Sequence, residues 1–149
     1  DVVNAAMIPE PPSPAKLDLI RRLLRASGLQ ADIDRGGFLD TYGRAGSQLF
    51  KDLAEARPDL TLGDAMQLPM EHLRQAYLPH RQVWQDEYEG HLNWEFTEDE
   101  LREIVAFLES TSGQHYLTAR WRMNAYISTN TEGLVDEIIR EARRRLGLS

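Results

Sequence analysis

Residues 96–114 read FTEDELREIVAFLESTSGQ, and this stretch decides the fold of the chain. Thr97 stands where a helix N-cap belongs, and Glu100 three positions later completes a capping box. The acidic side chains of this first turn also complement the helix dipole. Apolar residues then recur at helical spacing, at Leu101, Ile104, Val105 and Leu108. The stretch therefore predicts an amphipathic helix that begins just after Thr97.

The same stretch predicts that a second helix follows almost at once. Either Ser110 or Ser112 can cap it, and Leu117 and Trp121 continue it at helical spacing. A joint this short brings the ends of two helices together. We therefore expect a tight αα-hairpin in the second half of the chain.

The remainder of the chain also carries helical patterns. Apolar residues recur at helical spacing over 17–24, 38–53, 70–88 and 134–146. Pro69 is expected to start the third of these helices. Pro79 interrupts it, and the unbroken phase of the apolar stripe favours one helix kinked there, with a break at Tyr77-Leu78 as the alternative. No segment reads as a strand, so we expect an all-α, single-domain bundle of six or seven helices.

Residues 1–13 are expected to form an extended arm ahead of one helical domain over residues 14–149. The arm is marked by prolines, because the residue before each proline is biased away from the helix. These prolines are Pro9, Pro11, Pro12 and Pro14. Ser13 suits the N-cap of the first helix and Gly28 suits its end.

Composition narrows the classes of function. Hydrophobic residues make up 42% and charged residues 28% of the 149 residues, which is typical of a folded domain. A net charge of −7 argues against a nucleic-acid partner. No apolar run is long enough to predict a transmembrane segment. The absence of cysteine excludes disulfides, thiol nucleophiles and thiolate metal sites.

The stretch that decides the fold also resembles the signature of a bacterial domain-of-unknown-function family of small, mostly secreted helical proteins. The resemblance is carried by Phe96, Thr97, Glu100, Leu101, Phe107, Ser110, Gly113 and Gln114, in the pattern F-T-x-x-E-L … F-x-x-S-x-x-G-Q. The sequence differs from the family pattern at Leu108 and Thr111, where an aromatic residue and proline are common. The resemblance implies an all-helical fold, a removed signal peptide and a periplasmic or secreted protein. It implies no activity.

The signature residues also have a sufficient structural interpretation. Thr97 and Ser110 can cap helices, and Gly113 permits a close approach of the backbone. Leu101 and Phe107 can anchor the hairpin through apolar contacts. We therefore predict structural rather than catalytic roles for these residues.

Aromatic residues gather at positions 84–94 and form the candidate binding groove. They are Trp84, Tyr88, His91 and Trp94. Such side chains can line an apolar groove for a protein or a small apolar ligand, although the same spacing is typical of core packing. Glu87 and His91 share a helix face, but the other histidines have no spacing that converges on them, so we predict no metal site.

The sequence contains no motif for a catalytic or cofactor site. Ser110, Ser112 and Ser128 lack the G-x-S-x-G context of a nucleophile, and the phosphate-binding glycine patterns are missing. We therefore predict no catalytic residue and no cofactor, and favour a non-enzymatic binding or interaction module of the bacterial cell envelope. The alternative is a cell-envelope hydrolase whose site forms only on folding. A homo-oligomer is a further hypothesis, through the amphipathic C-terminal helix or the notch at Gly43 and Gly46.

Overall fold

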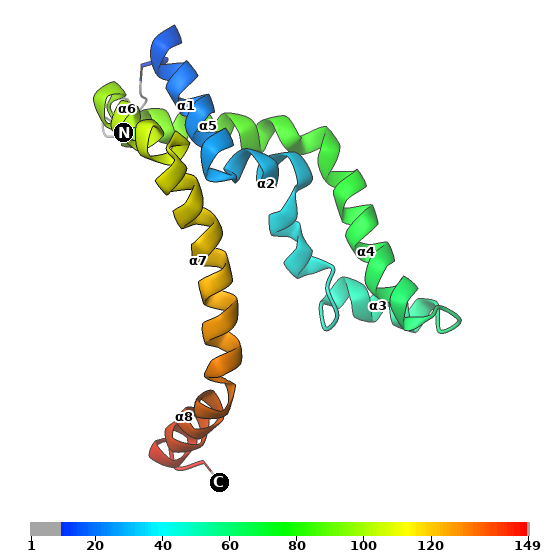
Figure 1. Ribbon diagram of the computed structural model, residues 1–149. Coiled ribbons are helices and arrows are strands. Elements are labelled where there is room, and N and C mark those ends of the chain that lie inside the picture. Colours follow the sequence, from blue (N-terminus) through cyan, green and yellow to red (C-terminus); the bar gives the residue numbers. More distant parts are fainter. Residues whose placement is uncertain (1–9, 149) are drawn as a thin grey trace, which may run out of the picture. The chain divides into compact units, whose positions relative to one another are not determined.

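The computed structural model describes residues 10–148, and every regular element in this part of the chain is helical (Figure 1). The prediction of an all-α protein is confirmed. The described residues form eight α-helices, so the predicted count of six or seven was too low. The chain divides into two compact units, and the boundary lies between Ala106 and Phe107. The single domain expected over residues 14–149 stays a prediction.

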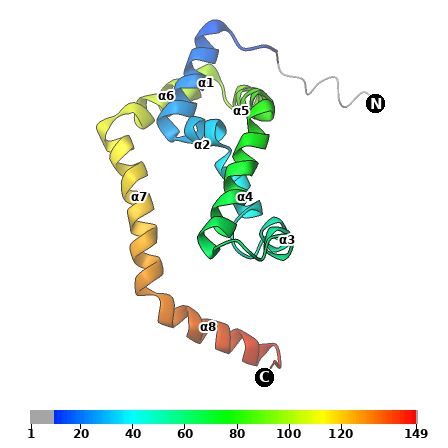
Figure 2. The same ribbon diagram turned by 90° about the vertical axis from the view of Figure 1, so that its right-hand side faces the viewer.

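The first unit contains two 3-10 segments among its helices. Its elements are α1 (Pro14–Ser27), α2 (Leu29–Arg35), η1 (Gly37–Tyr42), α3 (Gln48–Ala56), α4 (Leu62–Tyr77), η2 (Leu78–His80) and α5 (Arg81–Glu95). Helix α6 (Glu98–Glu109) begins in the first unit and ends in the second. The second unit continues with α7 (Thr111–Asn130) and α8 (Glu132–Arg145) (Figure 2).

Helix α1 supplies much of the core of the first unit. Its start matches the prediction, because the Ser13 hydroxyl accepts the Lys16 N–H at 3.1 Å and Gly28 ends the helix in the left-handed region, with φ 87°. One face of α1 packs against α2 and α5. The buried residues of that face are Leu19, Ile20, Leu23 and Leu24.

The end of the predicted arm is fixed to α5. The buried Asn93 side chain donates a hydrogen bond to the Glu10 carbonyl at 2.9 Å. The Lys16 ammonium donates to the Asn93 carbonyl at 2.8 Å. Residues 10–13 are not helical, as predicted, whereas the earlier part of the arm lies outside the described residues.

The helix predicted over residues 38–53 is instead divided between η1 and α3. Gly36 ends α2 with φ 65°, just before η1 begins. It lies so close to the Tyr77 ring that a Cβ at this position would be 2.6 Å from a ring carbon. Gly43 follows η1, and a Cβ there would lie 2.7 Å from the Leu73 side chain. The predicted small-residue notch is therefore occupied by α4 at Gly43. These tertiary contacts override the apolar periodicity.

Helix α4 begins earlier than predicted. The Thr61 hydroxyl accepts the Asp64 N–H at 3.1 Å, so the helix starts at Leu62 and continues through Pro69. Proline inside a helix removes one backbone hydrogen bond. Pro69 is buried on the same face as Ala65 and Tyr77, and this burial offsets the loss.

The run predicted over residues 70–88 is broken after Tyr77, where α4 ends, and does not form one kinked helix. Only the single 3-10 turn η2 separates α4 from α5, and Tyr77 and Leu78 keep right-handed helical dihedrals. The two helices diverge at an angle at this point (Figure 1).

The short joint after α6 is also as predicted, because Ser110 alone lies between α6 and α7. An antiparallel arrangement of these helices beyond the joint stays a prediction.

Candidate functional site

The first half of the family-like signature caps and anchors α6. The Thr97 hydroxyl accepts the Glu100 N–H at 3.2 Å and donates to the Glu100 carboxylate at 3.1 Å. In the usual capping box the acidic side chain instead accepts from the backbone N–H of the N-cap residue. Leu101 is completely buried and Phe96 is partly buried. These contacts support the structural interpretation of this half of the signature.

The second half of the signature forms the joint between α6 and α7. The Ser110 hydroxyl accepts the Gly113 N–H at 3.0 Å and donates to the Phe107 carbonyl at 2.6 Å. The Gln114 side chain donates to the Leu108 carbonyl at 2.5 Å. A Cβ on Gly113 would lie only 1.8 Å from the Phe107 oxygen, so no other residue type fits without moving the backbone. Ser110, Gly113 and Gln114 therefore each have a role in the joint. The Phe107 side chain is 51% exposed, so burial of its ring does not anchor the joint as predicted.

Trp84, the first residue of the candidate groove, is packed into an aromatic cluster. Its ring stacks on Phe38 at a centroid distance of 5.1 Å and meets Tyr77 edge-on at 5.3 Å. The Tyr77 hydroxyl donates to the Ile33 carbonyl at 2.5 Å, and burial raises the pKa of Tyr77. Trp84 thus stabilises the first unit by packing.

The other three groove candidates have different surroundings. Tyr88 is 37% exposed and lies at the edge of a hollow of about 330 Å³, which residues of α2 and η1 also line. The rings of His91 and Trp94 lie 5.9 Å apart, and Trp94 is 49% exposed. The structure therefore distributes the four predicted residues among a packed cluster, a shallow hollow and a small surface patch.

Several carboxylates of the described chain pair with arginine. The pKa of Asp34 is lowered by hydrogen bonds from Arg81 and Gln30, and that of Glu141 by hydrogen bonds from Arg144 and Arg145. This direction keeps a carboxylate charged, whereas a general acid at neutral pH needs a raised pKa. Over residues 10–148, no three histidine, aspartate or glutamate side chains are grouped to hold a metal ion. The hydrolase alternative stays a prediction.

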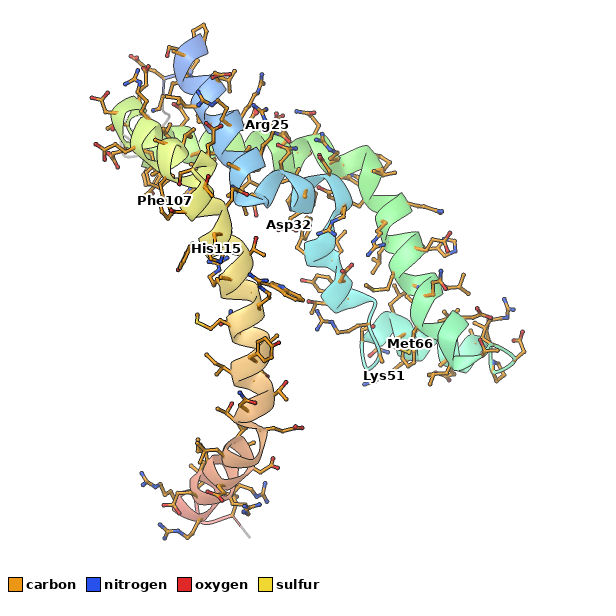
Figure 3. All side chains as sticks on the ribbon, in the orientation of Figure 1. Arg25, Asp32, Lys51, Met66, Phe107 and His115 are labelled. Carbon is orange, nitrogen blue, oxygen red and sulfur yellow. The ribbon has the colours of Figure 1, made fainter. Side chains whose placement is uncertain are left out.

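Exposed large apolar side chains are concentrated on the second unit. Figure 3 shows side chains projecting outwards along α7 and α8. Twelve large apolar residues of this unit are 46–76% exposed, and ten of them lie at position 121 or later: Trp121, Met123, Tyr126, Ile127, Leu134, Val135, Ile138, Ile139, Leu146 and Leu148. We call these ten residues the C-terminal apolar surface. Large exposed apolar surfaces of soluble proteins commonly mark interaction sites.

The α7 part of this surface was not among the predicted site residues. A signal was present in the sequence, because apolar residues occur on all sides of α7. Tyr116, Trp121 and Tyr126 point in very different directions around the helix axis. The apolar residues of α7 therefore do not form the single stripe by which a helix usually packs on one core.

The α8 part of the surface is a hollow along one helix. It measures about 370 Å³ and is lined by Leu134, Glu137, Ile138, Glu141, Ala142 and Arg145, all of which belong to α8. One helix cannot enclose a small molecule on several sides. The shape therefore suits an elongated partner that lies along α8.

None of the helices described here is both long and apolar enough to cross a membrane. No protein-family model, curated protein or solved structure matches the chain. The surfaces of the two units therefore carry the functional proposal.

Proposed function

We propose that this chain is a non-enzymatic interaction protein that binds another polypeptide through the C-terminal apolar surface. We place it in the periplasm or outside the bacterial cell, on the basis of the family resemblance at residues 96–114. The observation that carries the binding proposal is the exposure of ten large apolar side chains on one small unit.

The energies involved favour a macromolecular partner. Complete burial of one such side chain contributes about 1.5–3 kcal/mol. Association of two proteins costs about 4–15 kcal/mol in lost freedom, before side-chain ordering is included. Burial of several residues of the C-terminal apolar surface is therefore needed for stable binding. A long partner along α7 and α8 can achieve this, whereas a small molecule in an open hollow covers too little of the surface.

Tyr88, His91 and Trp94 on α5 offer a second and smaller surface. Trp94 is about half exposed beside His91, which suits an edge contact with a protein or a small apolar ligand. Trp84 is not expected to contribute, because Phe38 and Tyr77 already cover its ring.

Site-specific photocrosslinking in intact cells tests the proposal. A photoreactive amino acid at Ile138 lies on the apolar face of α8, and one at Arg140 lies on the opposite face of the same helix. We expect polypeptide adducts from position 138 and few from position 140. Equal labelling at both positions, or none at either, contradicts the binding proposal.

Cell fractionation tests the proposed location separately. The full-length protein should be recovered with periplasmic or extracellular markers. Recovery with cytoplasmic markers contradicts export without affecting the crosslinking result.

A further inference from the structure

Charge is distributed unevenly along α8. The helix has four acidic and four basic residues, so it carries no net charge in a chain whose net charge is −7. The acidic residues Glu132, Asp136 and Glu137 lie in the first half, whereas all four arginines lie at position 140 or later. The helix is therefore negative at its start and positive at its end.

We propose that α8 binds α8 of a second copy of this chain in antiparallel orientation. The inference rests on the proposed function and names the partner of the C-terminal apolar surface. An antiparallel pair places the acidic start of each helix beside the basic end of the other. Such a contact is self-complementary, as a two-fold symmetric interface requires.

One flank of the apolar stripe fits this orientation. Asp136 and Arg143 are seven residues apart and share that flank. Equivalent flanks face each other in an antiparallel helix pair, so Asp136 of each copy lies near Arg143 of the other. In a parallel pair the two acidic starts lie together and the basic ends lie together. That arrangement is repulsive at both ends.

The apolar stripe also fits an antiparallel pair. A two-fold axis that crosses the apolar face at the level of position 140 places Leu134 opposite the partner's Leu146. The same axis places Ile138 opposite the partner's Ala142. These side chains all lie on one face of α8. Leu134 is 55%, Ile138 59% and Leu146 73% exposed in one chain, so the pair covers side chains that one copy leaves in water.

The balance of acidic and basic residues on α8 also favours a second α8 over a lipid surface as the partner. Amphipathic helices that bind anionic bilayers are rich in lysine and arginine on the polar face. The four acidic residues of α8 cancel that attraction, and Glu141 is already bound to Arg144 and Arg145 at 2.8 and 2.9 Å. A second α8 uses both signs of charge, whereas an anionic bilayer uses only one.

Charge reversal in the full chain provides the first test. One variant changes Glu132, Asp136 and Glu137 to lysine, and the other changes Arg140, Arg143, Arg144 and Arg145 to glutamate. Sedimentation velocity across a micromolar concentration series should show that the unaltered chain dimerises. Each variant alone should self-associate at least tenfold more weakly, and an equimolar mixture should regain the dimer.

Cysteine crosslinking tests the orientation, and the chain has no cysteine of its own. Under mild oxidation, a mixture of the Leu134→Cys and Leu146→Cys chains should form the mixed disulfide in preference to either homodimer. Preferential formation of the two homodimers in the mixture indicates a parallel pair and overturns the proposal. Circular dichroism of each variant confirms that α8 is still helical.

Two other outcomes also overturn the proposal. One is an unaltered chain that stays monomeric over the whole series, and the other is a monomer that binds vesicles of anionic phospholipid through α8. If the chain is monomeric but position 138 still crosslinks to a different polypeptide, the proposed function stands and only the self-pairing is wrong. If position 138 captures nothing in cells either, both proposals fail.

Discussion

Helices α1 and α8 have the same length and the same apolar spacing but opposite surroundings. Each has 14 residues with two adjacent pairs of large aliphatic side chains, and the pairs are one turn apart. In α1 these are Leu19, Ile20, Leu23 and Leu24, which are 0–6% exposed. In α8 they are Leu134, Val135, Ile138 and Ile139, which are 46–59% exposed. The amphipathic pattern therefore predicts a face that needs to be covered, but not what covers it.

The comparison gives a physical meaning to the exposed face. In α1 the covering elements are α2 and α5 of the same unit. In α8 none of the helix residues is buried in the described structure. Because the two faces are of similar apolar character, the gain from covering α8 is comparable with the gain that α1 has already made.

Shortening one isoleucine in each helix should produce the largest contrast. Ile20→Ala is expected to lower the free energy of unfolding by about 2–5 kcal/mol, because Ile20 is completely buried and its removal leaves a cavity. Ile139→Ala should change it by less than about 1 kcal/mol under dilute, monomeric conditions. Urea denaturation checks both. Equal losses would show that α8 is covered within the monomer.

Replacing a packed glycine and an open glycine of the second unit by alanine should change stability in opposite directions. Gly113→Ala is expected to destabilise the joint by about 1–3 kcal/mol, because its Cβ would meet the Phe107 carbonyl. Gly133→Ala should stabilise α8 by up to about 1 kcal/mol, since nothing lies within 4 Å of its Cβ. Thermal unfolding followed by circular dichroism measures both. A stabilising Gly113→Ala variant would contradict the contact that we describe.

The two helix starts of the second unit should differ by a smaller amount. Ser110→Ala is expected to cost about 1 kcal/mol, because the Ser110 hydroxyl accepts the Gly113 N–H. Thr131→Ala should cost less, since the Thr131 hydroxyl donates to the Ile127 carbonyl at 2.6 Å and caps nothing in α8. Helix content and thermal midpoints of the two variants check this order.

The smallest effect should come from the ion pair between Arg81 and Asp34. The Arg81 Nε lies 2.9 Å from the Asp34 carboxylate, and the Asp34 side chain is 49% exposed, so solvent limits the contribution to at most about 1 kcal/mol. Because the folded pKa of Asp34 is below its ordinary value of 3.8, the stabilisation is present above that value and is lost as pH falls through the folded pKa.

Asp34→Asn should therefore be less stable than the unaltered chain at neutral pH, and the difference should disappear in acid. Glu141→Gln is the matched control, because the Glu141 pairs with arginine lie within one helix. Urea denaturation over a pH series should show little effect of that control. A constant difference for Asp34→Asn at all pH values would exclude the ion pair as its cause.

Local sequence signals predicted the parts of the fold that local contacts determine. Thr97 and Ser110 each accept a hydrogen bond from the backbone N–H of the residue three positions later. Both partners of each bond therefore lie within one short stretch of sequence. The division of residues 38–53 was not predicted, because it depends on Gly36 against Tyr77 and on Gly43 against α4. Those contacts join segments that are far apart in the sequence.

The candidate site was predicted less well for a related reason. The aromatic spacing of α5 correctly placed Trp84 on an apolar face, but it could not distinguish a packed ring from an open one. Trp121 and Tyr126 were missed because α7 has no clear polar side. Apolar spacing indicates which side chains share an apolar face. The residues that cover that face belong to other segments and are not given by the spacing.

The contacts of Asn93 have a consequence for proteases. Trypsin must bind the Lys16 ammonium in its specificity pocket, whereas here that ammonium donates a hydrogen bond to the backbone carbonyl of Asn93. Cleavage after Lys16 therefore requires this end of α1 to separate from α5 first. The rate of nicking at Lys16 in the folded protein should report how often the first turn of α1 opens, independently of global unfolding.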